Sequence, residues 1–212
     1  LILNRGVVVG NVDLGDGANA FTNAAGATFY SEAVLSLGAA SNLFTNEGRL
    51  EPGAQQRALV TQLSGSFVQA AGGVSQFELD FLSGVVDSVA ATGTAQVGGE
   101  VNVSLLNVHV IPSGTFVKPL YTAAGGITNA GLAFNPQRSA VIDYRLLWHA
   151  TSAEMEYTVD FSPPGVKGNR NAIGDWFNRV QAVGSSPELA DLVTRLVLEP
   201  DLDTYADLLT QL

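Results

Sequence analysis

Residues that could carry out chemistry are few in this sequence, and they do not fall into catalytic spacings. His109 and His149 each lie in a run that reads as a strand, and neither has a second histidine at the spacing of a metal site. A serine nucleophile needs a neighbouring base, and the Gly-x-Ser-x-Gly elbow does not occur. Ser66 and Ser113 only adjoin glycines, in a chain rich in both residue types. We therefore expect structural or surface roles for the histidines and no serine nucleophile.

Three pairs of carboxylates are spaced two residues apart. In a strand, such a pair projects from one face about 7 Å apart, an arrangement that could serve a polysaccharide lyase or a glycosidase. A solvated outer strand face explains the two strand pairs equally well and is commoner, and the third pair fits the charges expected where a helix begins. The pairs are Glu78 with Asp80, Glu154 with Glu156, and Asp201 with Asp203.

Asp13, Asp16 and Asn19 offer oxygen atoms that could bind calcium loosely. The repeated nonapeptide Gly-Gly-x-Gly-x-Asp of calcium-binding β-helices is absent, and so are phosphate loops and dinucleotide-binding fingerprints. We expect no catalytic residue, no cofactor and no metal ligand, so the chain is predicted not to be an enzyme.

Composition restricts the function further. The chain has 212 residues, of which 46% are hydrophobic and only 14% are charged, which favours a folded core over disorder. Its net charge of −10, with Lys118 and Lys167 as the only lysines, excludes a nucleic-acid surface and a polybasic membrane patch. The absence of cysteine excludes disulfides, thiolate catalysis, iron–sulfur clusters and cysteine zinc sites.

An internal repeat organises the first part of the chain. Residues 12–31 align with residues 35–54, and each copy contains a Leu-Gly pair, an asparagine and a Phe-Thr-Asn triplet. A period of about 20–25 residues is too short for a helical hairpin, and the leucine-rich-repeat consensus is absent, so a coil of a parallel β-helix fits best. Strands of successive coils stack about 4.8 Å apart. This stacking predicts two asparagine ladders, Asn19 over Asn42 and Asn23 over Asn46.

Strand signals continue to residue 162, although the repeat becomes less clear. Apolar and acidic residues alternate from Phe77 to Phe81. The runs 140–149 and 155–161 predict an antiparallel pair of strands, which would cover the last open coil and prevent edge pairing. One face of the second strand is apolar, with Met155, Tyr157, Val159 and Phe161.

After Pro163-Pro164-Gly165 the apolar period changes from about 2 to about 3.6, which predicts helices. The run Ser185-Ser186-Pro187-Glu188 carries the start signals of a second helix, Glu199-Pro200 ends it, and Asp201 or Asp203 caps a third. The predicted apolar stripes comprise Ile173, Trp176, Phe177 and Val180 in the first helix, Leu189, Leu192, Val193, Leu196 and Val197 in the second, and Leu202, Tyr205, Leu208, Leu209 and Leu212 in the third.

Several short motifs carry a resemblance to a known family. They are Tyr157 to Phe161, Pro164-Gly165, Asn169 to Arg179 with its Gly174-Asp175-Trp176-Phe177 core, Ser186 to Leu189, Leu208 to Leu212, and the turn Asn46 to Gly53 of the form Asn-x-Gly-x-Leu-x-Pro-Gly. With these motifs the chain resembles, over nearly its whole length, the C-terminal passenger region of bacterial autotransporters (type V secretion). Leu209-Thr210-Gln211-Leu212 is similar to the Asp-Gln-Leu that precedes the β-barrel in that family.

The resemblance implies separate roles for the parts of the whole protein. In the family, a signal peptide directs the chain to the periplasm, and the passenger crosses the outer membrane through the chain's own C-terminal β-barrel. The C-terminal β-helical segment, or autochaperone, emerges first and templates the rest. The implied partner is therefore that barrel, and the implied location is the bacterial cell surface. Some members are cleaved between two consecutive asparagines, a pair that does not occur here.

We predict a mainly β fold, with a right-handed parallel β-helix and capping hairpin in residues 1–162, and short C-terminal helices in residues 163–212. Residues 58–162 would be autochaperone-like, and residues 163–212 would form a linker toward the barrel. Since the chain begins with Leu1 and ends on an apolar residue, we expect a piece of a longer protein. The expected function is non-catalytic, to promote folding and secretion of the passenger and to form its surface stalk. The alternatives are a surface adhesin with an unknown host or surface ligand, and a fragment of a carbohydrate-active β-helix enzyme.

Overall fold

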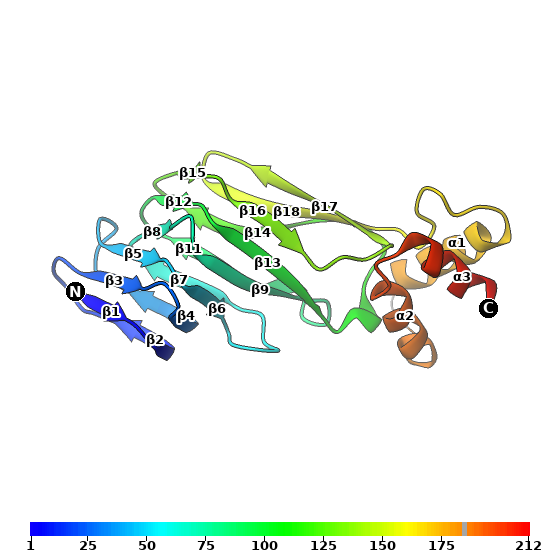
Figure 1. Ribbon diagram of the computed structural model, residues 1–212, viewed down its shortest axis with the longest axis horizontal. Coiled ribbons are helices and arrows are strands. Elements are labelled where there is room, and N and C mark those ends of the chain that lie inside the picture. The colour runs from blue at the N-terminus through cyan, green and yellow to red at the C-terminus, as the bar shows by residue number, and fades with distance from the viewer. Residues whose placement is uncertain (184–185) are drawn as a thin grey trace.

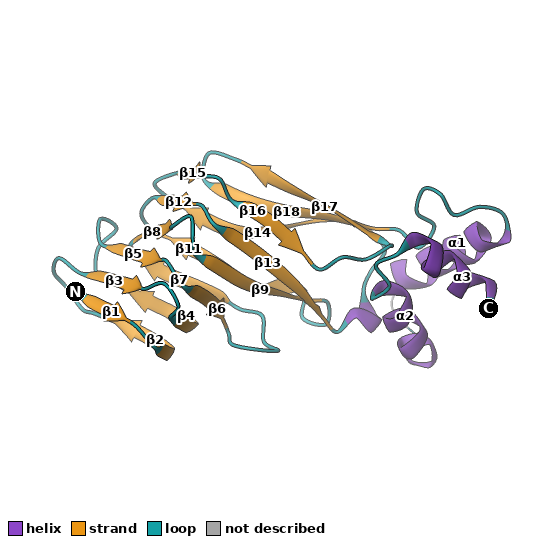
Figure 2. Cartoon of the chain, viewed as in Figure 1, coloured by secondary structure: helices purple, strands orange, loops and turns teal. Residues whose placement is uncertain are grey.

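The computed structural model describes residues 1–183 and 186–212. It is mainly β with short helices at the C-terminal end, which confirms that part of the sequence prediction. The molecule is elongated, with the strands in one part and the helices grouped at the opposite end (Figures 1 and 2). In this described part of the chain, no helix combines the length and apolarity needed to cross a membrane.

One sheet contains six short strands, and every pairing within it is parallel. Its register places Phe21 opposite Phe44 and Thr22 opposite Thr45. This pairing confirms the repeat that the Phe-Thr-Asn triplets predict. In spatial order the strands are β1 (Ile2–Asn4), β3 (Ala20–Asn23), β5 (Leu43–Asn46), β8 (Ser66–Gln69), β12 (Ala95–Val97) and β15 (Ile127–Asn129).

The second sheet contains twelve strands and is mixed. The long strand β4 (Thr28–Ser36) connects two sets of parallel strands within this sheet. Its first half pairs in parallel with β6, and its second half pairs in parallel with β7. In spatial order the strands are β16 (Ala133–Pro136), β13 (Glu100–Leu106), β9 (Val74–Asp80), β6 (Arg49–Pro52), β4, β7 (Val60–Ser64), β11 (Ser88–Ala91), β14 (Gly114–Ala123), β18 (Ser152–Val159) and β17 (Ile142–Trp148), while β2 (Val7–Asp13) pairs with β4 and β10 (Val85–Val86) pairs with β9.

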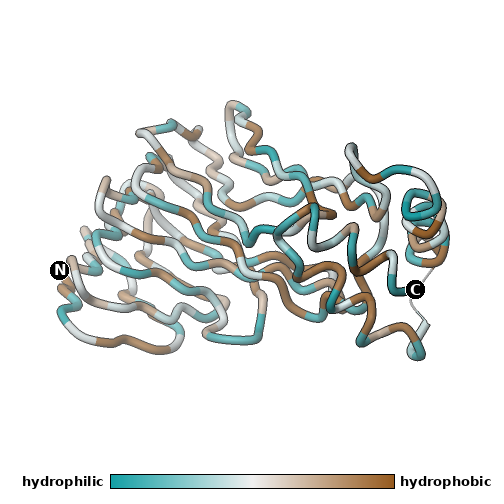
Figure 3. The backbone as a smooth tube through the Cα atoms, turned by 45° about the vertical axis from the view of Figure 1, so that its right-hand side comes forward, coloured by the Kyte–Doolittle hydropathy of each residue, from teal (hydrophilic) through white to brown (hydrophobic). Residues whose placement is uncertain are grey.

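Apolar and polar residues alternate along the strands (Figure 3). The buried apolar side chains form the core. A column of aromatic rings runs through it. The ring centroids are 5.3 Å apart for Phe21 and Phe44, 5.4 Å for Phe44 and Phe67, and 5.9 Å for Phe67 and Tyr121. Offset stacking at these distances adds to the stabilisation from burial. The repeated phenylalanine is therefore the sequence feature that builds this part of the core.

A ladder of side-chain amides runs beside the aromatic column. The Nδ2 group of Asn23 donates to Oδ1 of Asn46 at 2.8 Å, which confirms the second predicted ladder. The ladder is longer than predicted, because Asn4 donates to Asn23 at 2.8 Å and Asn46 donates to Gln69 at 3.2 Å. All four amide side chains are buried. Since each amide donates to the next, the ladder has a single direction along the stack.

The first predicted ladder, Asn19 over Asn42, is wrong as an amide-to-amide contact. The Nδ2 groups of both residues donate to the main-chain carbonyl of Leu37, and Asn42 also donates to the carbonyl of Gly17 at 2.7 Å. The two asparagines do lie at neighbouring turns, but they satisfy main-chain groups there rather than each other.

The predicted antiparallel pair is confirmed: β17 pairs with β18, which in turn pairs antiparallel with β14. The four residues of the predicted apolar face are buried, while Glu156 and Thr158 between them are partly exposed. This hairpin extends the edge of a row of strands that is otherwise parallel. The apolar face consists of Met155, Tyr157, Val159 and Phe161.

Three helices follow, α1 (Asn169–Ala182), α2 (Ala190–Val197) and α3 (Leu202–Thr210). Helix α1 is joined to the end of β18 through Phe161, whose amide donates to Oδ1 of Asn178 at 2.8 Å. The hydroxyl of Tyr205 in α3 donates to the carbonyl of Phe161 at 2.5 Å. Asp201 caps α3, as predicted, by accepting a hydrogen bond from the Thr204 amide at 2.8 Å.

Two expectations for the helices need correction. Trp176 is 44% exposed, because the buried face of α1 is formed by Gly174, Phe177 and Gln181. Ser186 does not cap α2 with its side chain; a 3-10 turn, η2 (Pro187–Leu189), precedes that helix and the Ser186 hydroxyl contacts Glu188. Ser185 of the predicted start signal lies outside the described residues. The predicted apolar face of α2 is confirmed at Val193, Leu196 and Val197.

Candidate functional site

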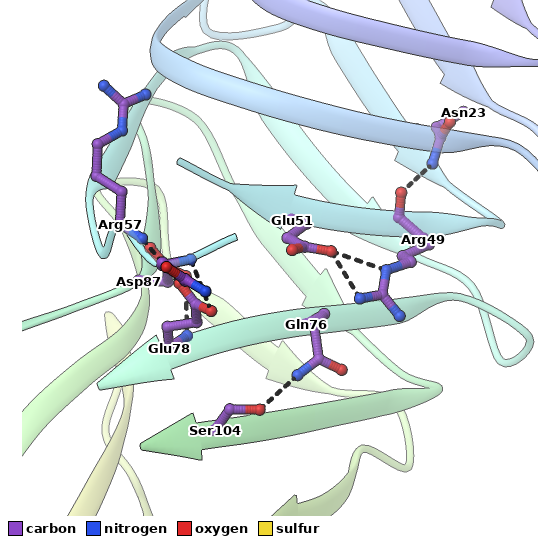
Figure 4. Close-up of polar contacts among 9 residues, drawn as sticks. Asn23, Arg49, Glu51, Arg57, Gln76, Glu78, Asp87 and Ser104 are labelled. Atoms are coloured by element: carbon purple, nitrogen blue, oxygen red, sulfur yellow. Dashed lines mark hydrogen bonds and ion pairs between the residues drawn. The ribbon is translucent and has the colours of Figure 1, made fainter. Parts of the chain in front are cut away.

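Two buried carboxyl groups, those of Glu78 and Asp87, bind the loop of residues 53–59, and a third, that of Glu51, lies near them. Their exposed fractions are 1% for Glu51, 8% for Glu78 and 0% for Asp87. Glu51 is on β6, Glu78 is on the neighbouring strand β9, and Asp87 follows β10, which folds back on β9. The topology therefore brings together side chains that are far apart in sequence (Figure 4). Buried carboxyl groups need hydrogen-bond partners, and for Glu78 and Asp87 three of these partners are main-chain amides of the loop.

The loop donates main-chain amides to this cluster. The Glu78 carboxyl group accepts from the amides of Gln56 and Arg57, at 3.1 and 3.0 Å. Asp87 accepts from the amide of Leu59 at 2.6 Å and from the amide of Glu78 itself at 2.8 Å. Glu78 and Asp87 thus each bond to one segment of the loop. The expectation that Glu78 lies on a solvated strand face is therefore wrong.

Two arginines lie near the cluster, and each is engaged with a glutamate. Arg49 binds Glu51 through Nε at 2.9 Å and Nη2 at 2.6 Å, and Arg57 pairs with Glu32 on β4. Figure 4 shows the Arg57 guanidinium pointing away from Glu78 and Asp87. Burial raises the pKa of Asp87 to about 8, and the nearby carboxyl groups of Glu78 and Glu51 add to the rise, against the two amide hydrogen bonds. The cluster can therefore hold a proton near neutral pH.

The other carboxylates of the three predicted pairs also have hydrogen-bond or ion-pair partners. Asp80, the partner of Glu78 in the first pair, accepts from the amide of Leu82 at 2.9 Å and from Asn107 at 2.6 Å, so it holds the turn after β9. In the second pair, Glu154 accepts from the Ser152 hydroxyl, and Glu156 lies 3.4 Å from Arg145 on the partly exposed face of the hairpin. The interpretation as a solvated strand face therefore fits Glu154 and Glu156. Asp201 caps α3, and Asp203 lies in its first turn.

The two histidines and the serines Ser66 and Ser113 lie apart, and both serine hydroxyls bond to main-chain carbonyls. His109 lies in a 3-10 turn, η1 (Val108–Val110), and not in the predicted strand, because Asn107 before it adopts a left-handed conformation with φ of 52°. His149 follows the end of β17 and lies 3.6 Å from Glu154. The Ser66 hydroxyl donates to the carbonyl of Ala40, and that of Ser113 donates to the carbonyl of Asn178.

No group of three or more potential metal ligands occurs among the residues that the structure describes. At the suggested calcium loop, Asp13 accepts from the amide of Gly15 at 3.0 Å. Asn19 directs its amide nitrogen, and not its oxygen, toward the carbonyl of Gly15 at 2.9 Å. Asp13 and Asn19 thus bond to main-chain groups of this loop, and Asn19 also donates to the carbonyl of Leu37.

An open groove of about 520 Å³ lies between β16 and β17. Phe134 and Tyr144 face each other across it edge to face, with ring centroids 6.4 Å apart. Arg138 and Asp143 contribute its charges. The groove combines aromatic and polar groups, and the Ser139 hydroxyl, which also lines it, accepts a hydrogen bond from the amide of Val141 at 3.2 Å.

Sequence reasoning missed Asp87 and Glu51 entirely. Asp87 lies in a short apolar run, and its partners Leu59 and Glu78 are 28 and 9 residues away. The local signal was a lone acidic residue after Val85 and Val86, which fits a buried carboxyl group as well as an exposed one. No protein-family model matches the chain, and no curated protein is significantly similar to it.

Proposed function

We propose that the chain is a non-catalytic segment of a bacterial autotransporter passenger, built as a right-handed parallel β-helix at the cell surface. Residues 58–162 would act as an autochaperone that templates the coils before them. Residues 163–212 would lead toward the chain's own outer-membrane β-barrel. The observation that carries this proposal is the unbroken parallel stacking of strands with matching phenylalanine and amide ladders. In such a stack each unit offers a template for its neighbour.

The two ends of the stack of strands differ in how their strands pair, and this difference supports the same proposal. At the C-terminal end, the hairpin β17–β18 continues the sheet with antiparallel strands, and Pro136 in β16 lacks an amide proton for further pairing. At the other end, β1 and β2 pair in parallel with the next unit, and their apolar residues Ile2 and Val9 are 40% and 68% exposed. Growth of the stack is therefore favoured toward the N-terminal side, as templating by the C-terminal part requires.

The composition fits passage through a narrow pore. A disulfide closed before transport would make the chain bulky, and this chain has no cysteine. Stability comes instead from the apolar core and the amide ladder. An enzymatic role is less favoured, because Glu78 lies beneath the 53–59 loop and Asp80 holds a turn.

Refolding of fragments tests the autochaperone proposal. We expect residues 58–212 to refold cooperatively alone and residues 1–57 to remain largely unfolded alone, because the latter contain only the first units of the stack. Adding residues 58–212 to residues 1–57 should restore strand signal in circular dichroism beyond the sum of the two fragments. If residues 1–57 fold equally well without the C-terminal fragment, the proposal fails.

A further inference from the structure

The hairpin β17–β18 covers the last unit of the stack, but its own outer strand is an edge. In the part of the chain that the structure describes, β17 pairs with β18 on one side and with no strand on the other. Figure 1 shows β17 along the outer margin of the strands, on the side away from β1 and β2. Such an edge presents a row of main-chain groups that can pair with a further strand.

The free main-chain groups of β17 follow a regular spacing. The amide of His149 donates to the carbonyl of Ser152 at 2.9 Å, and hydrogen-bonded positions alternate along an antiparallel pair. The odd-numbered residues of β17 therefore bond to β18, and the even-numbered residues direct their amides and carbonyls to the open edge. At the start of the strand this edge is already occupied, because the amide of Ala140 donates to the carbonyl of Glu199 at 2.7 Å. The residues with free groups are Ile142, Tyr144, Leu146 and Trp148.

The outward face of β17 carries two opposite charges two residues apart. Asp143 and Arg145 are both exposed. Arg145 lies 3.4 Å from Glu156, but its side chain is still 68% exposed, so it can bind a second carboxylate. The ion pairs among the described residues leave Asp143 without a cationic partner. The other face of the strand packs against the core with Ile142, Tyr144, Leu146 and Trp148.

We propose that β17 is a self-association surface, which pairs antiparallel with β17 of a second copy of this chain, centred on Tyr144. With a twofold axis at Tyr144, Asp143 of each copy lies opposite Arg145 of the other. These two positions are not hydrogen-bonded in the new pairing, so their side chains approach closely, and opposite charges stabilise such a pair. The inference goes beyond the proposed function, since it uses only the edge of this chain.

The remaining positions are compatible with this register. On the apolar face, Ile142 lies opposite Leu146 and the two Tyr144 side chains lie opposite each other, as apolar and aromatic cross-strand pairs do in stable sheets. Three hydrogen-bonded pairs of residues contribute about six main-chain hydrogen bonds. Because the pairing is twofold, it ends at two copies and does not continue into a filament.

The charges disfavour the neighbouring registers. Pairing centred on Arg145 would use more of the free main-chain groups, but it would place two arginines directly opposite each other. Pairing centred on Asp143 would do the same with two aspartates, and like charges in this position destabilise a strand pair. Pairing centred on Leu146 would place Arg145 opposite Leu147, without an ion pair between these positions. The alternation of charge on β17 therefore selects the register centred on Tyr144.

Charge reversal in the whole 212-residue chain tests this register. Sedimentation velocity is measured up to about 0.5 mM protein, because a single strand pair makes a small interface and a weak dimer. We expect the native chain to dimerise reversibly. Asp143→Arg and Arg145→Asp each place like charges opposite each other twice, so each should raise the dissociation constant of its own dimer by about tenfold or more. The matched control Asp16→Arg makes the same change of charge at an exposed position outside β17, and it should dimerise like the native chain.

An equimolar mixture of the two β17 variants provides the decisive comparison. One copy then carries arginine at both positions and the other carries aspartate at both, so opposite charges face each other again. We expect the mixture to form heterodimers about as tightly as the native chain dimerises. A mixture that associates no better than the separate variants would overturn the proposal.

Two further results would also overturn it. One is a native chain that stays monomeric over the whole concentration range. The other is association that both variants leave unchanged, as a contact through β1 and β2 would give. If circular dichroism shows that either variant has lost its fold, the salt dependence of the native dimer decides the question. Two exposed ion pairs predict weaker association at high salt, and association that salt does not weaken contradicts the proposal.

Discussion

Replacing Asn23 with alanine is expected to lower the free energy of unfolding by about 3 kcal/mol, because three polar groups lose a hydrogen bond to its buried side chain. Asn23 is fully buried, and its Nδ2 group donates to Oδ1 of Asn46 at 2.8 Å and to the carbonyl of Arg49 at 2.9 Å. Its oxygen accepts from Asn4. Alanine cannot replace any of these bonds, and no solvent reaches the site. Urea unfolding followed by circular dichroism measures the loss, with the denaturant dependence unchanged.

Asn11→Ala is the matched control. The exposed Asn11 side chain accepts one hydrogen bond, from the amide of Val34 at 2.8 Å, and water can take its place. We expect a loss below about 1 kcal/mol. Equal losses for the two variants would mean that the ladder contributes no more than an exposed hydrogen bond does.

Replacing Gly174 with alanine is expected to destabilise the protein by about 2–3 kcal/mol, although alanine is the better helix former. An added Cβ at this position would overlap the carbonyl oxygen of Phe161 and approach Cα of Ser162. Helix α1 would have to move away from the end of β18. That movement would also strain the bonds of Asn178 and Tyr205 to Phe161.

The sign of the effect makes this test sharp. Helix propensity alone predicts that Gly174→Ala stabilises the chain by about 1 kcal/mol, whereas the close contact with Phe161 predicts destabilisation. Ala172→Gly at an exposed position of the same helix should cost about 1 kcal/mol, which calibrates the propensity term. A higher melting temperature for Gly174→Ala would contradict the described joint between α1 and β18.

Features that repeat along the sequence could be predicted, because stacking converts a sequence period into a spatial contact. The Phe-Thr-Asn triplets align in the structure, and Asn23 meets Asn46. Asn4 and Gln69 belong to the same ladder but were not predicted. Asn4 lies 19 residues before Asn23, which departs from the repeat of 23 residues, and Gln69 keeps that spacing but is a different residue type. A change in loop length breaks the sequence period without breaking the stack.

Local departures from a regular apolar period, and side chains brought together from distant parts of the sequence, could not be predicted from the repeat. The alternation at His109 indicated a strand, but the left-handed conformation of Asn107 turns the chain there. The helical period identified α1, but the contact of Gly174 with Phe161 rotates Trp176 outward. Glu78 showed strand alternation, yet it is buried because a loop 21–22 residues earlier covers it. Each of these features depends on a contact that no local pattern contains.

Surface delivery is the most direct test of the autotransporter proposal. Residues 1–212 and residues 1–57 are each placed between the same signal peptide and the same autotransporter-type β-barrel, with an epitope tag before Leu1, and intact cells are treated with external protease. We predict that the longer fusion displays the tag outside the cell and leaves a protease-resistant core, while the shorter fusion leaves none. Retention of the longer fusion in the periplasm, or equal delivery and equal resistance of both fusions, would contradict the proposal.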